Sequence, residues 1–194
     1  MAAFRPIATT RSSTGILTSK LAVWWLLASE VVIFGGILAA YIMHRVNHPE
    51  WGGPGFANDT NEYIGFINTM VLLTSSYFAV RAHNAAERGE GSTAANWLYL
   101  TILCAAAFLC IKGYEWTTEI SHGYVPWKNP FWAFYYTAAG IHASHVIGGG
   151  IVMLWVAGTA RRNEELHRVE NAGLYWHFVD IVWIFLFPLL YIAK

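Results

Sequence analysis

Long apolar runs alternate with short polar connections along the chain. The runs fall at about 20–44, 62–86, 94–118, 131–158 and 172–192. As a helix, each run is long enough to cross about 30 Å of hydrocarbon, because a helix rises about 1.5 Å per residue. We therefore predict an all-α protein, a polytopic membrane helical bundle with five transmembrane helices over 20–194. A cytoplasmic N-terminal tail over 1–19 is expected to precede it.

Polar and turn-forming residues mark the ends of the predicted helices. Asp59 and Glu62 have the spacing of a capping pair for the second helix. Ser92 or Thr93 is the predicted cap of the third helix. The polar segment RRNEELHRVEN is expected to form the connection before the fifth helix.

The composition agrees with a membrane protein. The 194 residues are 56% hydrophobic and only 12% charged, whereas about a quarter of the residues in a soluble domain are charged. The chain also has 10 Trp, 10 Tyr and 11 Phe, a level typical of aromatic belts at two membrane interfaces. The net charge is zero and no basic run indicates a nucleic-acid partner.

The distribution of Lys and Arg predicts the orientation. One side of the predicted bundle carries eight of these residues, and the other side carries four, counting Arg45, Lys112, Lys128 and Lys194. Cytoplasmic loops are enriched in Lys and Arg. We therefore predict that the N-terminus is cytoplasmic and that the C-terminus lies outside. Arg45 and Lys112 could also extend toward the interface from within the membrane.

Ionisable residues inside the apolar runs are the candidate functional groups, since they are costly in a membrane. Glu30 and His145 are expected at a similar depth near the midplane, and His142 shares a helix face with His145. Asp180 and His177 are placed in the inner half, within the first turns of the last helix. Glu115 is placed near the outer end of the third helix. Each of these six residues could be structural or linked to proton movement.

Four interpretations of these residues compete. In the first, each group hydrogen-bonds a partner on a neighbouring helix and stabilises the packing. In the second, histidines and a carboxylate bind a metal ion, although no Glu-x-x-His motif is present. In the third, Glu30, His145 and Asp180 relay protons. In the fourth, polar residues hold phospholipids, and Arg81, His83 and Trp176 are the candidate lipid contacts.

Five segments resemble one known family in sequence and in order. They read SEVVIFGG, NTMVLLTSSYFAVRAHNA, GYEW, GIHASHVIGG and YWHFVDIVWIFLF. They are similar to subunit III of the heme–copper terminal oxidases, in the bacterial five-helix form that lacks the first two helices of the seven-helix form. Glu30 matches the family's buried, carbodiimide-reactive carboxylate. His142, His145, Glu115, Trp176, His177 and Asp180 match other family positions.

The resemblance implies a non-catalytic subunit of a proton-pumping oxidase that reduces oxygen to water in aerobic respiration. Hemes and copper would lie in partner subunits, with catalytic subunit I and subunit II as partners and none of these cofactors in this chain. Family members bind phospholipids, support assembly and sustained proton uptake, and are a proposed route for oxygen. The electron donor would be cytochrome c or a quinol-linked partner complex, and the location the bacterial cytoplasmic membrane.

Some features leave other functions open. Arg81 and Asn84 stand where the family often has Trp and a second His, so lipid contacts at this stretch do not transfer directly. One alternative is an accessory membrane protein of nitric oxide reductase. Another is a free-standing transporter or metal-binding membrane protein, for which the Gly148–Gly150 run could mark a broken helix. We interpret His177 and Asp180 as a satisfied pair that fastens the last helix to its neighbours, rather than as a catalytic couple.

Overall fold

A computed structural model describes residues 15–48 and 60–193, and in these residues the protein is a bundle of long helices. Five of the helical segments are long and apolar enough to cross a membrane. They are α1 (Thr18–Asn47), α2 (Glu62–Glu87), α3 (Gly91–Ser121), α4 (Pro130–Ala160) and α5 (His167–Phe187), which continues into the π-helical turn η4 (Pro188–Ile192). The predicted all-α fold with five transmembrane helices is confirmed.

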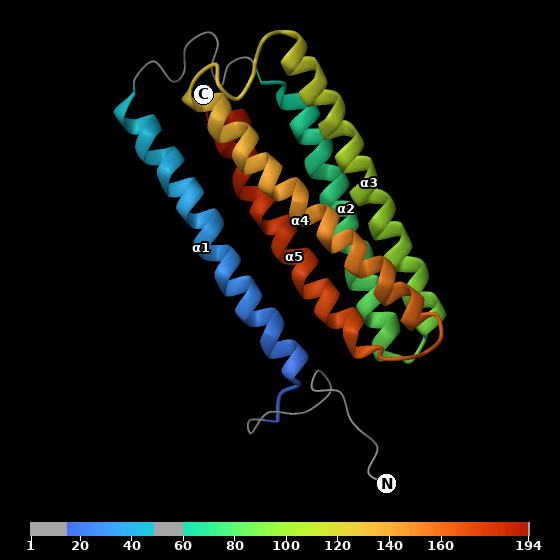
Figure 1. Cartoon of the computed structure of the whole chain (residues 1–194). Coiled ribbons are helices and arrows are strands. Elements are labelled where there is room, and N and C mark those ends of the chain that lie inside the picture. Colours follow the sequence, from blue (N-terminus) through green and yellow to red (C-terminus); the bar gives the residue numbers. More distant parts are fainter. Residues whose placement is uncertain (1–14, 49–59, 194) are drawn as a thin grey trace.

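The helices run alternately up and down, as Figure 1 shows. The start of α1 therefore lies at the same end of the bundle as the α2–α3 and α4–α5 connections. Most Arg residues of the described chain lie at this end, namely Arg81, Arg88, Arg161, Arg162 and Arg168. We call it the arginine-rich end and the other the opposite end. That the arginine-rich end faces the cytoplasm stays a prediction from the charge bias.

Two helix starts differ from the predictions. Asn61 caps α2, because its side-chain oxygen accepts hydrogen bonds from the N–H groups of Tyr63 and Ile64 at 3.1 and 3.3 Å. The predicted cap residue Asp59 lies outside the described residues. Ser92 and Thr93 lie inside α3, which begins at Gly91, so the prediction that either caps it was wrong.

The start of α3 is instead capped from the α4–α5 connection. The side-chain oxygen of Asn163 accepts a hydrogen bond from the Gly91 N–H at 2.8 Å. A Cβ atom at position 91 would lie 2.1 Å from the carbonyl oxygen of Ala160. Glycine is therefore required where these two segments meet.

The last helix begins at His167, five residues before the predicted start at 172. Its first turn contains Arg168 and Glu170, which have good helix propensity, and the carboxylate of Glu170 pairs with the ammonium group of Lys20 at 2.5 Å. As a result, Asp180 lies 13 residues after His167 and 12 before Ile192. The prediction that Asp180 belongs to the first turns was wrong, since it lies in the middle of the span.

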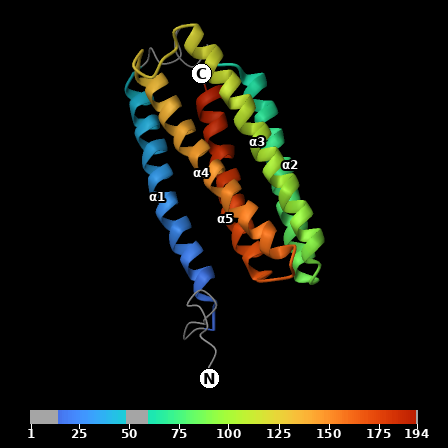
Figure 2. The ribbon, with the colours of Figure 1, turned by 45° about the vertical axis from the view of Figure 1, so that its right-hand side comes forward.

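The core forms between α2, α3, α4 and α5. Buried alanines lie on α2 and α3, the helices that pack most extensively on each other, and small side chains allow two helices to approach closely. The indole groups of Trp176 and Trp183 on α5 are also buried. Figures 1 and 2 both show α1 at an edge, where it packs on α5 and α4. Only Glu30, Phe34 and Tyr41 of α1 are buried, so α1 is the most exposed helix.

Candidate functional site

Glu30 and His145 join α1 to α4 in the middle of the bundle. The Oε2 atom of Glu30 lies 2.9 Å from the Nε2 atom of His145. His145 is 15 residues from either end of α4, which places the pair at mid-span. The Nδ1 atom of His145 lies 2.8 Å from the carbonyl oxygen of Ile141 on its own helix. With both ring nitrogens engaged, His145 holds α1 against the bundle.

His142 faces a different neighbour from His145. Its ring is fully buried and contacts Phe108 of α3 and Trp183 of α5, at centroid distances of 5.6 and 5.1 Å. Neither ring nitrogen has a hydrogen-bond partner in the described part of the chain. The expectation that each buried polar group bonds a neighbouring helix therefore does not hold for His142, which packs as an aromatic ring.

His177 and Asp180 do not pair with each other. The Nδ1 atom of His177 lies 2.8 Å from the hydroxyl oxygen of Ser76 on α2. Both carboxylate oxygens of Asp180 are buried and accept no hydrogen bond of ordinary geometry from the described residues, with Ser76 as the nearby polar side chain. His177 therefore fastens α5 to a neighbouring helix, as the sequence led us to expect, whereas Asp180 has no comparable bond in the described residues.

A polar cluster that the sequence reasoning missed lies in the half of the bundle toward the opposite end. Lys112 is only 2% exposed, and its ammonium group donates hydrogen bonds to Oε2 of Glu115 at 3.0 Å, to the hydroxyl of Tyr135 at 3.0 Å and to the hydroxyl of Tyr191. Both tyrosines in turn donate to Oε1 of Glu115, at 2.9 and 2.7 Å. All three ammonium donors and both carboxylate oxygens are thus engaged.

This Lys112 cluster, comprising Lys112, Glu115, Tyr135 and Tyr191, changes one earlier expectation. Lys112 does not extend to the membrane surface, so it does not belong among the loop charges used to predict orientation. It forms a buried ion pair with Glu115 instead. A lysine and a glutamate three residues apart in an apolar helix were the available signal for this pair.

The π-helical turn η4 carries Tyr191 into the cluster and links it to α1. Pro188 opens the turn and has no N–H group to donate. The carbonyl of Leu189 accepts a hydrogen bond from the hydroxyl of Tyr41 on α1 at 2.7 Å. The end of the chain therefore ties α1, α3 and α4 together near the opposite end.

The predicted lipid contacts fall in two environments. Arg81 is exposed, and its guanidinium group lies over the ring of Trp97 at 4.9 Å, while His83 lies 3.4 Å from the carboxylate of Glu87. Trp176, however, is fully buried, and its N–H donates to the hydroxyl of Ser75 at 2.9 Å. The indole ring of Trp176 packs against α4 at Gly149, where the absence of a side chain leaves room for it. The ring therefore does not reach the surface, where lipid would contact it. The lipid-contact prediction for Trp176 was wrong.

The structure also bears on the predicted metal site and on the predicted break in the fourth helix. The described residues contain no group of three or more His, Cys, Asp or Glu side chains arranged to hold a metal ion. The Gly148–Gly150 run lies inside the continuous helix α4, so it does not mark a broken helix. The described residues thus combine an edge helix, joined to α4 at mid-span by Glu30 and His145, with a closed polar cluster in the core.

The family model that describes cytochrome c oxidase subunit III matches residues 6–194. The chain belongs to this family. It is 35% identical to a cytochrome c oxidase subunit 3 of Thermostichus vulcanus, over 86% of this chain and 83% of that protein. It is 31% identical to a cytochrome c oxidase subunit 3 of Bacillus sp. (strain PS3), over 96% of this chain and 92% of that protein.

A third relative is much longer than this chain. It is a heme–copper oxidase subunit I+III of Aeropyrum pernix, 32% identical over 90% of this chain and 22% of that longer protein. Together these findings show that the chain is a non-catalytic subunit of a heme–copper oxidase, with subunit I as a partner. It is a multi-pass membrane protein. The individual roles of the predicted site residues stay predictions.

Proposed function

We propose that this subunit is a membrane scaffold that packs beside catalytic subunit I and holds phospholipid at its surface. One observation carries the proposal: Lys112 and Glu115, the most deeply buried charged side chains of the described residues, bond each other and two tyrosines. Such a network stabilises one arrangement of helices. The outward surface is apolar, with Trp25 and Val46 exposed by 78% and 77%, which suits lipid and neighbouring helices.

The proposal extends to the rest of the complex. Subunit II would be a further partner, hemes and copper would lie in the partner subunits, and cytochrome c or a quinol-linked complex would donate electrons. The name of the Aeropyrum pernix relative joins subunits I and III in one protein, which supports a direct contact with subunit I. Bacterial relatives and five spans support a location in the bacterial cytoplasmic membrane.

Support of sustained proton uptake and of oxygen access are further parts of the proposal. Glu30 lies at mid-span on α1, the least buried helix, and contacts His145 of α4, so the pair could influence a neighbouring subunit. An oxidase prepared without this chain is expected to begin turnover normally and then lose activity faster than the complete enzyme. Equal loss in both preparations would contradict this role.

Purification through a tag on this chain in mild detergent tests the scaffold. We expect heme absorbance and oxygen consumption to co-purify with it, and the heme bands and preferred donor then identify the enzyme type. A colourless, folded chain that emerges alone would overturn the proposal and favour the free-standing transporter. Co-purification with nitric oxide reduction, without oxygen consumption, would instead favour an accessory protein of nitric oxide reductase.

A further inference from the structure

Five aromatic side chains form a continuous row from the middle of the bundle to its opposite end. Between ring centres, Trp183 on α5 lies 6.4 Å from Tyr191, and Tyr191 lies 5.9 Å from Tyr135 on α4. Tyr135 lies 5.2 Å from Trp132, and the ring of Trp132 stacks on that of Tyr124 at 4.8 Å. We call these five residues the aromatic row.

The two ends of the row have different surroundings. Trp183 is 1% exposed and lies near the middle of the span, where its ring contacts Phe108 and His142. Tyr124 is partly exposed in the loop between α3 and α4, and it lines a cavity of about 300 Å³ at the opposite end. The row therefore connects the buried interior of the bundle with its aqueous face.

The side chains of the row can carry electrons one at a time. Among side chains without sulfur, the indole of tryptophan and the phenol of tyrosine lose a single electron most readily. Electrons move between such rings when the rings lie close together, because the rate of transfer falls steeply with distance. Trp183, Tyr191, Tyr135 and Trp132 are each at most 1% exposed. Radicals on these four rings are therefore shielded from solvent while the electron moves.

Glu115 lies where the two buried tyrosines need a proton acceptor. A phenol that loses an electron becomes so strong an acid that even a carboxylate in an ion pair takes its proton. The Oε1 atom of Glu115 accepts hydrogen bonds from Tyr135 at 2.9 Å and from Tyr191 at 2.7 Å, which is within reach for proton transfer. The ammonium group of Lys112 donates to both hydroxyls, so each phenol oxygen keeps a donor after its proton has left.

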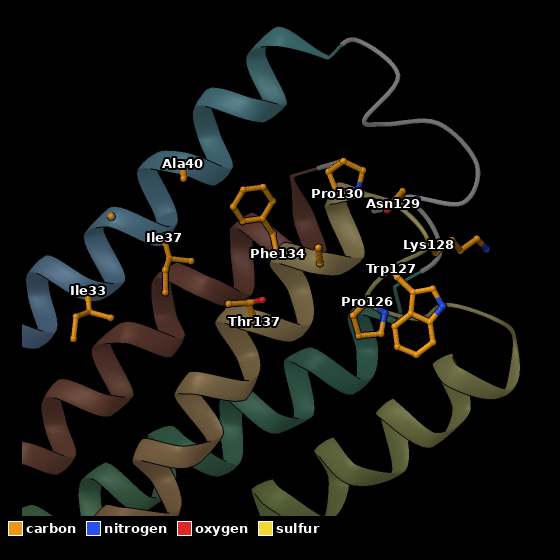
Figure 3. A pocket seen from close by; sticks show the side chains of 12 residues that line it. Ile33, Ile37, Ala40, Pro126, Trp127, Lys128, Asn129, Pro130, Phe134 and Thr137 are labelled. Atoms are coloured by element: carbon orange, nitrogen blue, oxygen red, sulfur yellow. The ribbon is translucent and has the colours of Figure 1, made fainter.

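Water-soluble molecules have access to the outer end of the row. Figure 3 shows Lys128 on the loop that precedes α4, and its ammonium group lies 3.9 Å from the ring centre of Tyr124. Tyr136, which is also partly exposed, provides a second outlet, because its ring lies 5.2 Å from that of Tyr135 and 6.1 Å from that of Trp132. Electrons can therefore enter the row from the aqueous face at two tyrosines.

We propose that the aromatic row is an electron-transfer path that discharges strong one-electron oxidants arising inside the membrane, with Glu115 as the proton acceptor for its two buried tyrosines. The oxidant is a radical formed when oxygen is incompletely reduced, such as the hydroxyl radical. The reductant is a water-soluble one-electron donor such as ascorbate. This inference rests on the proposed function only for the source of the oxidant, which is an assembled oxidase that reduces oxygen.

Electrons and protons balance in two steps. In the first step, the hydroxyl radical takes one electron from Trp183 and becomes hydroxide. Tyr191 restores Trp183 by giving up one electron, and its phenol proton moves to Glu115. In the second step, one electron from the reductant enters at Tyr124 and passes along the row to Tyr191, and Glu115 returns the proton. The net result is the transfer of one electron from the reductant to the radical.

The test measures permanent oxidation of Trp183 in the purified oxidase after treatment with hydrogen peroxide, with and without ascorbate. Peptide mass spectrometry gives the fraction of Trp183 that has gained oxygen. Tyr191→Phe interrupts the row in the core, because phenylalanine is not oxidised under these conditions. Tyr124→Phe/Tyr136→Phe closes both outlets at partly exposed positions. Tyr99→Phe, on α3 and outside the row, is the control.

Ascorbate should lower the oxidised fraction of Trp183 several-fold in the unsubstituted enzyme and in Tyr99→Phe. It should make no difference in Tyr191→Phe or in Tyr124→Phe/Tyr136→Phe. Equal protection in all four samples would overturn the inference, because ascorbate would then act in solution and not through the row. Trp183 that stays unoxidised in every sample would also overturn it. Absent heme in the unsubstituted sample would instead count against the proposed function, so the two failures are distinguishable.

The role of Glu115 has a test of its own. Lys112→Met/Glu115→Leu leaves every ring of the row in place but removes the proton acceptor, so ascorbate should no longer protect Trp183. Retained protection in this variant would overturn the assignment of Glu115. If Tyr191→Phe fails to assemble, the outlet variant still decides the inference, because its substitutions lie outside the buried core. Heme absorbance of each sample shows which variants have assembled.

Discussion

The Lys112 cluster provides the sharpest test of how this bundle is stabilised. Replacing Glu115 with leucine removes the carboxylate that accepts hydrogen bonds from the ammonium group of Lys112 and from the hydroxyls of Tyr135 and Tyr191. Lys112, 2% exposed, then stays in the core without its ion-pair partner and with hydrogen bonds to two neutral hydroxyls. Breaking a fully buried pair in this way costs about 3–5 kcal/mol.

Removing both charges should cost much less. In the double variant Lys112→Met/Glu115→Leu neither member of this ion pair is left, and the hydroxyls of Tyr135 and Tyr191, 3.2 Å apart, can still bond each other. Replacement of a buried ion pair by apolar side chains of similar volume is often neutral or stabilising. We therefore expect the double variant to recover most of the stability that Glu115→Leu loses.

The assay is the thermal release of this chain from the immobilised oxidase. For a chain of this size, 1 kcal/mol shifts a melting temperature by about 2–4 °C. Glu115→Leu should therefore lower the release temperature by roughly 6–20 °C. The matched control is Glu164→Leu, because Glu164 pairs with Arg162 at the surface, where the two side chains are 57% and 63% exposed.

Exposed pairs contribute about 0–1 kcal/mol, so the control should change the release temperature by only a few degrees. Two results would refute the reasoning. One is a Glu115→Leu variant that behaves like the control, which would mean that water reaches Lys112. The other is a double variant no more stable than Glu115→Leu, which would mean that shape and not charge pairing decides stability at this position.

The other predictions concern mid-span contacts. Glu30→Ala should loosen α1 at mid-span, at a cost of about 1–3 kcal/mol for the unpartnered His145, and Glu30→Gln should retain most of the contact. Spin-label distances between the middle of α1 and α4 that stay unchanged in Glu30→Ala would contradict this. Gly149→Leu should destabilise the bundle by about 1–3 kcal/mol, because a Cβ atom there would lie 3.0 Å from the Trp176 ring. Gly150→Leu is the control, because a Cβ atom at that position meets nothing within 4 Å. Equal release temperatures of the two variants would refute the packing argument. In the Asp180→Leu variant the amount of this chain in the purified complex should stay the same or rise. The reason is that the carboxylate oxygens of Asp180 have no partner of ordinary geometry in the described residues. Loss of the chain would show that the carboxyl group has a partner in the assembly.

The sequence alone was sufficient for the features that depend on local composition. The number and approximate limits of the spanning helices follow from runs of apolar residues, because the thickness of the bilayer sets how long each run must be. The similar depth of Glu30 and His145 was predictable in the same way, since depth along a helix is a fixed rise per residue. Family membership was also readable, from five ordered segments of a single chain.

Only the tertiary structure decided which polar groups meet. Tyr191 lies 79 residues from Lys112 along the chain, and no local pattern indicates that η4 turns its hydroxyl toward α3. His177 and Asp180 are one turn apart, yet the rotation of α5 directs the histidine to Ser76 and leaves the carboxylate without a comparable bond. The rotation and height of each helix depend on packing against all its neighbours at once, and a single sequence does not encode that in any one segment.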